Sequence, residues 1–190
     1  MIENFLRAPR TPGAYFADAV RVVGALSVIA AALWWTPTDA GIVALTLPAL
    51  LVPRFVGVRP SFDIAACLTI LIAAWSNVFD LYTSVPGWDL LIHFACTGVL
   101  AVLVYLLLSF VDVTPPPHTP AFTRRAAVVL VTAFGLALSA LWEVVEWLGE
   151  TFVTDEIFVT YSDTIGDMVL GGLGALVAAV FFARAPAART

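Results

Sequence analysis

The chain has 190 residues, of which 61% are hydrophobic and only 12% are charged. Soluble domains have roughly 45–50% hydrophobic and about 25% charged residues, so these values exclude a soluble globular domain. They also exclude a disordered chain, which needs low hydrophobicity and high net charge. All cations are arginines and none form a basic run, so no nucleic-acid partner is expected. The composition predicts an integral membrane protein.

Six apolar segments predict membrane-spanning helices, because a helix needs roughly 20 mostly apolar residues to cross the hydrocarbon layer. In chain order they cover residues 17–35, 39–52, 63–79, 88–111, 126–148 and 161–183. The first follows arginines, as the core of a signal peptide would, but it lacks a cleavage site and is expected to remain as a span. The second is short and contains Pro48, which should kink it. It could instead be a re-entrant hairpin.

The arginines decide between these two topologies. If all six segments cross, every arginine falls on one face of the membrane: Arg7, Arg10, Arg21, Arg54, Arg59, Arg124, Arg125, Arg184 and Arg189. Without the second span they would be scattered over both faces. The positive-inside rule assigns the arginine-bearing face to the cytoplasm. We therefore expect an all-α, polytopic bundle of six transmembrane helices, a single transmembrane domain over residues 1–190 with both termini in the cytoplasm.

Three spans each carry a pair of ionisable side chains near their outer ends. These are Asp89 and His93 in the fourth span, Glu143 and Glu146 in the fifth, and Asp163 and Asp167 in the sixth. Spacings of three or four residues place each pair on one helical face. Ionisable residues inside a bilayer normally face the bundle interior and mark a functional site. We therefore expect the three pairs to converge, with Asp80 and Glu150 as possible additions at the rim.

Five of these six side chains are carboxylates, on a face without arginines. Two like charges 4 Å apart repel by about 4 kcal/mol at an effective dielectric constant of 20. Shared protons or a bound cation would relieve this repulsion. One imidazole among carboxylates suits a divalent ion such as Zn, Mn, Fe, Mg or Ca, and metal sites in helical bundles use this spacing. Two alternatives stay open: a protonated network, and solvated helix ends in which Asp89 and Asp163 only favour helix N-termini.

The three motifs together resemble those of the YjdF-like bacterial inner-membrane proteins and, more distantly, the VanZ-like superfamily. The motifs are Asp89-x-x-x-His93-Phe94, Trp142-Glu143-x-x-Glu146-Trp147 and Asp163-Thr164-x-x-Asp167-Met168. The resemblance covers roughly residues 80–183 and implies an all-helical protein of the bacterial plasma membrane, with its site facing the extracytoplasmic side. The VanZ branch is associated with resistance to a glycopeptide antibiotic. VanZ-like proteins usually carry an arginine shortly before the last motif, and this chain has none between Arg125 and Arg184.

Three functions fit these features. The first is metal-dependent hydrolysis of an envelope or lipid-linked substrate at the outer leaflet, with Glu146 or His93 as the catalytic base. The second is a non-catalytic, metal-binding accessory or scaffold protein, which could be a subunit of a larger membrane complex. The third is cation or proton transport, which needs a polar path through the whole membrane. Residues 172–183 of the last span offer no side chain for such a path. Membrane lipids are expected partners in each case.

Overall fold

The computed structural model describes residues 2–154, 157 and 159–185. Within these residues the chain is helical and contains no strand. The helices are α1 (Ile2–Leu6), α2 (Pro12–Trp34), α3 (Pro37–Val56), α4 (Pro60–Val78), α5 (Leu81–Ser84), α6 (Trp88–Ser109), α7 (Arg124–Phe152) and α8 (Tyr161–Arg184). Six of them, all but α1 and α5, are long and apolar enough to cross a membrane. This confirms the predicted all-α architecture with six spans.

Local sequence signals fix where the long helices begin. A threonine precedes α2, α3, α7 and α8, and in each case its hydroxyl accepts a hydrogen bond from the backbone N–H three residues later. This capping satisfies an N–H group that has no partner within the helix. Proline occupies the first helical position of α2, α3 and α4, where its missing N–H costs nothing.

The second span is a full-length helix. α3 has 20 residues, which corresponds to about 30 Å, the thickness of the hydrocarbon layer. Pro48 and Pro53 both lie inside α3 without ending it. The structure therefore favours a second crossing over a re-entrant hairpin, and the helix is longer at both ends than the predicted range of 39–52.

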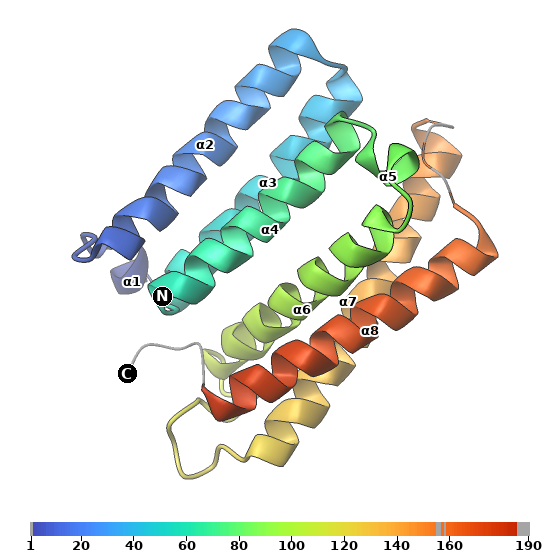
Figure 1. Cartoon of the computed structure of the whole chain (residues 1–190). Coiled ribbons are helices and arrows are strands. Elements are labelled where there is room, and N and C mark those ends of the chain that lie inside the picture. The colour runs from blue at the N-terminus through green and yellow to red at the C-terminus, as the bar shows by residue number, and fades with distance from the viewer. Residues whose placement is uncertain (1, 155–156, 158, 186–190) are drawn as a thin grey trace.

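The long helices form two groups of three. α2, α3 and α4 pack against one another, and so do α6, α7 and α8. Figure 1 shows the two groups side by side, with the axes of the long helices roughly aligned and their chain direction alternating. α6 joins the groups through contacts with α3 and α4.

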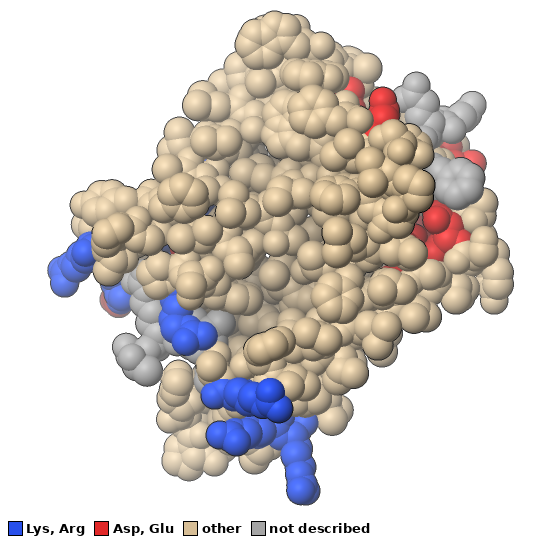
Figure 2. All heavy atoms as spheres, in the orientation of Figure 1, with Lys and Arg blue, Asp and Glu red and all other residues tan. Residues whose placement is uncertain are grey.

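Positive and negative side chains gather at opposite ends of the bundle (Figure 2). We call one the arginine end, after Arg7, Arg10, Arg54, Arg59, Arg124, Arg125 and Arg184. We call the other the acidic end, after Asp89, Glu143, Glu146, Asp163 and Asp167. Arg189 lies outside the described residues. The separation means that the candidate site has no arginine beside it in the described part of the chain.

Candidate metal centre

The backbones of α6 and α8 touch at two glycines, and this contact positions the site. A Cβ atom added at Gly174 would lie 1.9 Å from the carbonyl oxygen of Phe94, and one added at Gly98 would lie 2.9 Å from the carbonyl oxygen of Gly174. Only residues without a side chain allow helices to approach this closely. The contact brings His93, next to Phe94, against Asp167, which lies two turns before Gly174 on α8.

α7 joins the same contact through small and hydroxyl side chains. Ser139 Oγ donates a hydrogen bond of 3.3 Å to the carbonyl oxygen of Asp167. A Cβ atom added at Gly171 would lie 2.7 Å from Ser139 Oγ and 2.9 Å from Thr97 Oγ1. Glu143 follows Ser139 by one helical turn and therefore lies on the same face of α7. The α7 carboxylate is thus carried into the space between α6 and α8.

The imidazole of His93 lies between carboxylates from all three helices. Its Nε2 is 3.4 Å from Asp89 Oδ1 and 3.9 Å from Asp167 Oδ1. The other ring nitrogen, Nδ1, is 4.0 Å from Glu143 Oε1. Only the contact with Asp89 is near hydrogen-bonding distance.

Two of these carboxylate oxygens are buried without a partner. The side chains of Glu143 and Asp167 are 8% and 1% exposed. Among the described residues, no hydrogen-bond donor reaches Glu143 Oε1 or Asp167 Oδ1. A buried polar atom without a partner costs roughly 1–3 kcal/mol, and more when it is charged. Both atoms lie beside a ring nitrogen of His93. The buried oxygens that lack a hydrogen-bond donor or a cation are therefore gathered around this one imidazole.

Five side chains form two overlapping triads with potential ligand atoms within 4.8 Å of one another. The first triad is Asp89, His93 and Asp167, and the second is His93, Glu143 and Glu146. Zinc binds nitrogen and oxygen ligands at about 2.0–2.2 Å, which places ligand pairs about 3–4 Å apart. The separations at Nε2 and the separation at Nδ1 are therefore each of the size that a divalent ion bridges. His93 belongs to both triads.

Three other acidic residues from the sequence prediction lie in neither triad. Asp163 sits in the first turn of α8, where its backbone N–H donates to the hydroxyl of Thr160. The Glu150 carboxylate accepts a hydrogen bond of 3.3 Å from its neighbour Thr151. Asp80 has a left-handed backbone (φ 54°) and precedes α5. The structure thus brings together five of the six predicted ligands and leaves Asp163 one turn away.

Two residues beside the cluster were not predicted from the sequence. Thr164 lies on α8 one turn before Asp167 and lines the same groove as Glu143. Tyr82, on the short helix α5, donates a hydrogen bond of 2.8 Å to the carbonyl oxygen of Ala73. Burial raises the pKa of Tyr82 above its ordinary value, and the nearby Cys96, Asp89 and Glu146 add to this rise. Thr164 lies inside the third motif, so the sequence offered a signal for this residue. No motif pointed to Tyr82 on α5.

A groove of about 320 Å³ opens beside the cluster at the acidic end. Its lining comes from α7, the start of α8 and the residues before it: Glu143, Val144, Trp147, Val159, Thr160, Tyr161 and Thr164. Apart from Glu143 the lining carries no charge. Glu143 belongs to both the groove and the second triad, so it connects the buried cluster with the surface.

Comparison with known proteins gives a family but no characterised relative. A family described as "Predicted membrane protein (DUF2238)" matches residues 15–188, which include α2 from its fourth residue onward, the other five long helices and both triads. The chain belongs to the DUF2238 family. No curated protein and no solved structure shows significant similarity to it. The family description agrees with the six membrane spans of this DUF2238 protein and assigns no chemistry to its cluster.

Proposed function

We propose that this DUF2238 protein binds a divalent metal ion between α6, α7 and α8 and hydrolyses an envelope or lipid-linked substrate there. The observation that carries the metal site is the pair of buried, unpartnered oxygens, Asp167 Oδ1 beside Nε2 of His93 and Glu143 Oε1 beside Nδ1. Buried charges in proteins are normally paired or bound to a metal. A divalent cation held at Nε2 would supply the missing partner for Asp167 Oδ1, and one held at Nδ1 would supply it for Glu143 Oε1.

The donor set supports a metal more than a purely protonated network. The nitrogen–oxygen contacts around His93, of which the 3.4 Å from Asp89 is the shortest, are longer than the hydrogen bonds that a purely protonated network would use. Separations of 3.4 to 4.0 Å around His93 suit atoms that share an ion. An imidazole with carboxylates suits Zn, Mn, Fe, Mg or Ca. Asp163, one turn further out, is an outer member of the proposed ligand set.

Hydrolysis is the reaction that these residues support best. A bound divalent ion supplies an activated water and positive charge. When Asp89, His93 and Asp167 hold the ion, the α7 carboxylates remain as bases, and Glu146 is the one we assign to accept the proton. If carboxylates hold the ion without His93, the imidazole of His93 accepts the proton instead. The apolar groove beside Glu143 would hold the hydrophobic part of the substrate.

We propose that the acidic end faces the extracytoplasmic side of a bacterial plasma membrane. The support is the arginine end, which the positive-inside rule assigns to the cytoplasm, together with the resemblance of the three motifs to YjdF-like and VanZ-like proteins. The substrate would then approach from the outer leaflet. On this proposal residues 1–190 act as one transmembrane domain with both termini in the cytoplasm.

A metal-binding accessory or scaffold protein is the second candidate. Asp167 is only 1% exposed, and closed sites of this kind are typical of structural metals. A role as a subunit of a larger membrane complex would use the same ligands without turnover. Transport is less well supported, because the halves of α6, α7 and α8 nearer the arginine end carry no carboxylate or imidazole within the bundle.

Metal content tests the proposal. The protein is purified in detergent and measured by inductively coupled plasma mass spectrometry as wild type, Glu143→Gln and Asp167→Asn. Glu150→Gln is the control, because Glu150 lies on α7 outside both triads. We expect a stoichiometric ion in the wild type and the control and its loss in the other two. Equal trace amounts in all four proteins would leave only the protonated network.

A further inference from the structure

A second cavity lies at the arginine end, away from the candidate metal centre. Its volume is about 390 Å³, within the roughly 300–1,000 Å³ of ligand pockets. Its lining comes from the segment between α1 and α2 and from the nearby ends of α2, α3 and α4: Arg7, Ala8, Pro9, Arg10, Thr11, Ala14, Arg54 and Pro60. Three of these residues are arginines, and none is acidic.

Specific contacts hold the wall of this cavity in place. Asn4 Nδ2 donates to two carbonyl oxygens at the end of α3, each at 3.2 Å. The ring of Phe5 stacks on Phe55, with 4.4 Å between the ring centroids. Arg54 donates through Nε to the carbonyl oxygen of Phe5 at 3.3 Å and through Nη2 to that of Arg7. These contacts fix α1 and the residues after it against α3. The cavity therefore has a defined wall.

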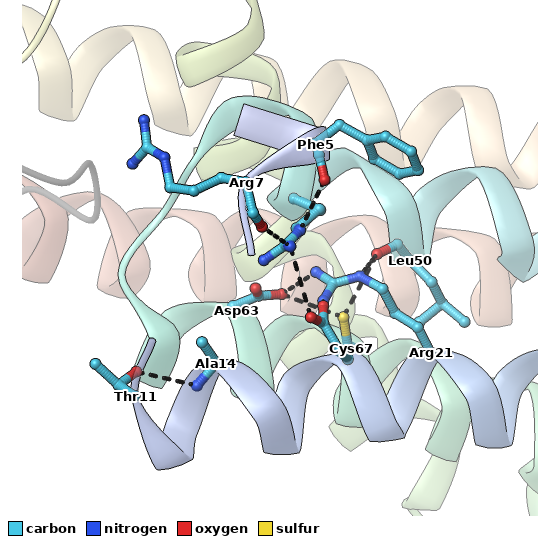
Figure 3. A network of polar contacts seen from close by, with 10 residues as sticks. Phe5, Arg7, Thr11, Ala14, Arg21, Leu50, Asp63 and Cys67 are labelled. Atoms are coloured by element: carbon cyan, nitrogen blue, oxygen red, sulfur yellow. Dashed lines mark hydrogen bonds and ion pairs between the residues drawn. The ribbon is translucent and has the colours of Figure 1, made fainter. Parts of the chain in front are cut away.

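A buried ion-pair network next to the cavity engages Asp18 of α2 and Asp63 of α4 (Figure 3). Arg21, 10% exposed, pairs with Asp63 and, at 3.0 Å, with Asp18. It also donates to the carbonyl oxygen of Leu50 at 2.9 Å. Asp18 lies 3.6 Å from Arg54 as well. These carboxylates are thus engaged by Arg21 and Arg54, which leaves the other two arginines of the cavity unneutralised.

Arg7 and Arg10 carry that uncompensated charge. Arg7 donates to the neutral Asn4 Oδ1 at 3.1 Å, and no carboxylate of the described residues pairs with Arg7 or Arg10. Both side chains are exposed. Thr11 lines the same cavity and caps the N-terminus of α2, which adds a partial positive charge. The cavity therefore presents two guanidinium groups and a positive helix end to an incoming ligand.

We propose that this cavity binds the phosphate group of an anionic phospholipid headgroup. Guanidinium groups bind phosphate through paired, charge-assisted hydrogen bonds. The cavity lies where the spans end, which is the depth of lipid headgroups, and basic pockets between membrane helices bind such headgroups. Free inorganic phosphate offers the same chemistry, but the position at the ends of the spans favours the lipid.

Native mass spectrometry of the full chain in neutral detergent tests this proposal. Phosphatidylglycerol or phosphatidylcholine is added to the delipidated wild type and to the double variant Arg7→Gln/Arg10→Gln. We expect one phosphatidylglycerol to be retained in preference to phosphatidylcholine, and its affinity to fall on the order of tenfold or more in the double variant. The fold should survive, because both side chains are exposed and Arg54 uses only the backbone carbonyl of Arg7.

The matched control is Arg124→Gln/Arg125→Gln, which removes two charges from the same end of the bundle outside the cavity. It should retain phosphatidylglycerol as the wild type does. Competition with inorganic phosphate separates the two sources: displacement at millimolar concentration supports the phosphate site and identifies the free ion as a ligand, and the absence of displacement supports the lipid. Equal retention in all three proteins, or equal retention of both lipids, would overturn the proposal.

Discussion

Glu143 and Asp167 each lie beside a different ring nitrogen of His93. Glu143 Oε1 lies 4.0 Å from Nδ1, and Asp167 Oδ1 lies 3.9 Å from Nε2. The two carboxylates come from different helices, α7 and α8, and His93 comes from a third, α6. One side chain therefore links the three helices of the second group at the acidic end, and its removal affects every proposed ligand position at once.

Replacing His93 by Gln should weaken metal binding more than any single carboxylate change. His93 is the member common to both triads, whereas Glu146→Gln removes a ligand from only one of them. The expected loss of affinity exceeds the roughly 10–100-fold that accompanies loss of an outer partner of a metal ligand. Isothermal titration with Mn²⁺ and Zn²⁺ measures both variants. If His93→Gln binds as tightly as the wild type, the imidazole is not a ligand.

Replacing Gly174 by Ala should push α6 and α8 apart. The added Cβ would lie 1.9 Å from the carbonyl oxygen of Phe94, and overpacking of this kind costs typically 1–3 kcal/mol of unfolding free energy. Gly41→Ala is the control, because nothing lies within 4 Å of a Cβ atom added there. Thermal unfolding in detergent compares the two variants. Equal midpoints would show that the helices accommodate the methyl group without cost.

Replacing Asp63 by Leu should destabilise the first helix group. Asp63 and Arg21 are 7% and 10% exposed, and breaking a buried ion pair costs about 3–5 kcal/mol because one charge stays buried. Since Asp18 also contacts Arg21, we expect the lower end of this range. The double variant Arg21→Met/Asp63→Leu should recover part of the loss, and denaturant titration measures both. A double variant less stable than Asp63→Leu would show that Arg21 acts independently of Asp63.

Cysteine labelling in a bacterial host should establish the membrane orientation. In a background without Cys67 and Cys96, Tyr161→Cys at the acidic end should react with a membrane-impermeant maleimide in intact spheroplasts. Arg124→Cys at the arginine end should react only after the membrane is permeabilised. Both sites are exposed, so accessibility within the protein does not limit the reaction. The reverse pattern would place the candidate metal centre on the cytoplasmic side.

The six spans could be predicted from the sequence because hydropathy locates the apolar segments and the arginine distribution favours a crossing for the short second one. Their ends were less certain. α3 extends over Pro37–Val56 because Pro37 is well placed at a helix start and Pro48 and Pro53 are tolerated inside. α7 continues to Phe152, beyond the predicted limit of 148, because its polar last turn remains helical outside the apolar stretch.

The sequence predicted which site residues share one face of a helix. It was less informative about how close site residues on different helices come. The spacing of Asp89 and His93 places both on one face of α6, and their contact follows directly. The approach of Asp167 depends on the backbone contact between Gly174 and Phe94, a distance that no spacing rule provides. Asp163 was grouped with Asp167 by the same spacing rule, but its place in the capped first turn of α8 keeps it outside both triads.

The sharing of His93 between two triads limits how many ions this centre can take up. A neutral imidazole has one nitrogen lone pair free for coordination, because the other nitrogen carries the proton. Occupation through Nε2 and occupation through Nδ1 are therefore mutually exclusive, and a titration should saturate at one equivalent. A second equivalent would require His93 to become an imidazolate bridge, and the release of its remaining proton into the buffer would reveal it.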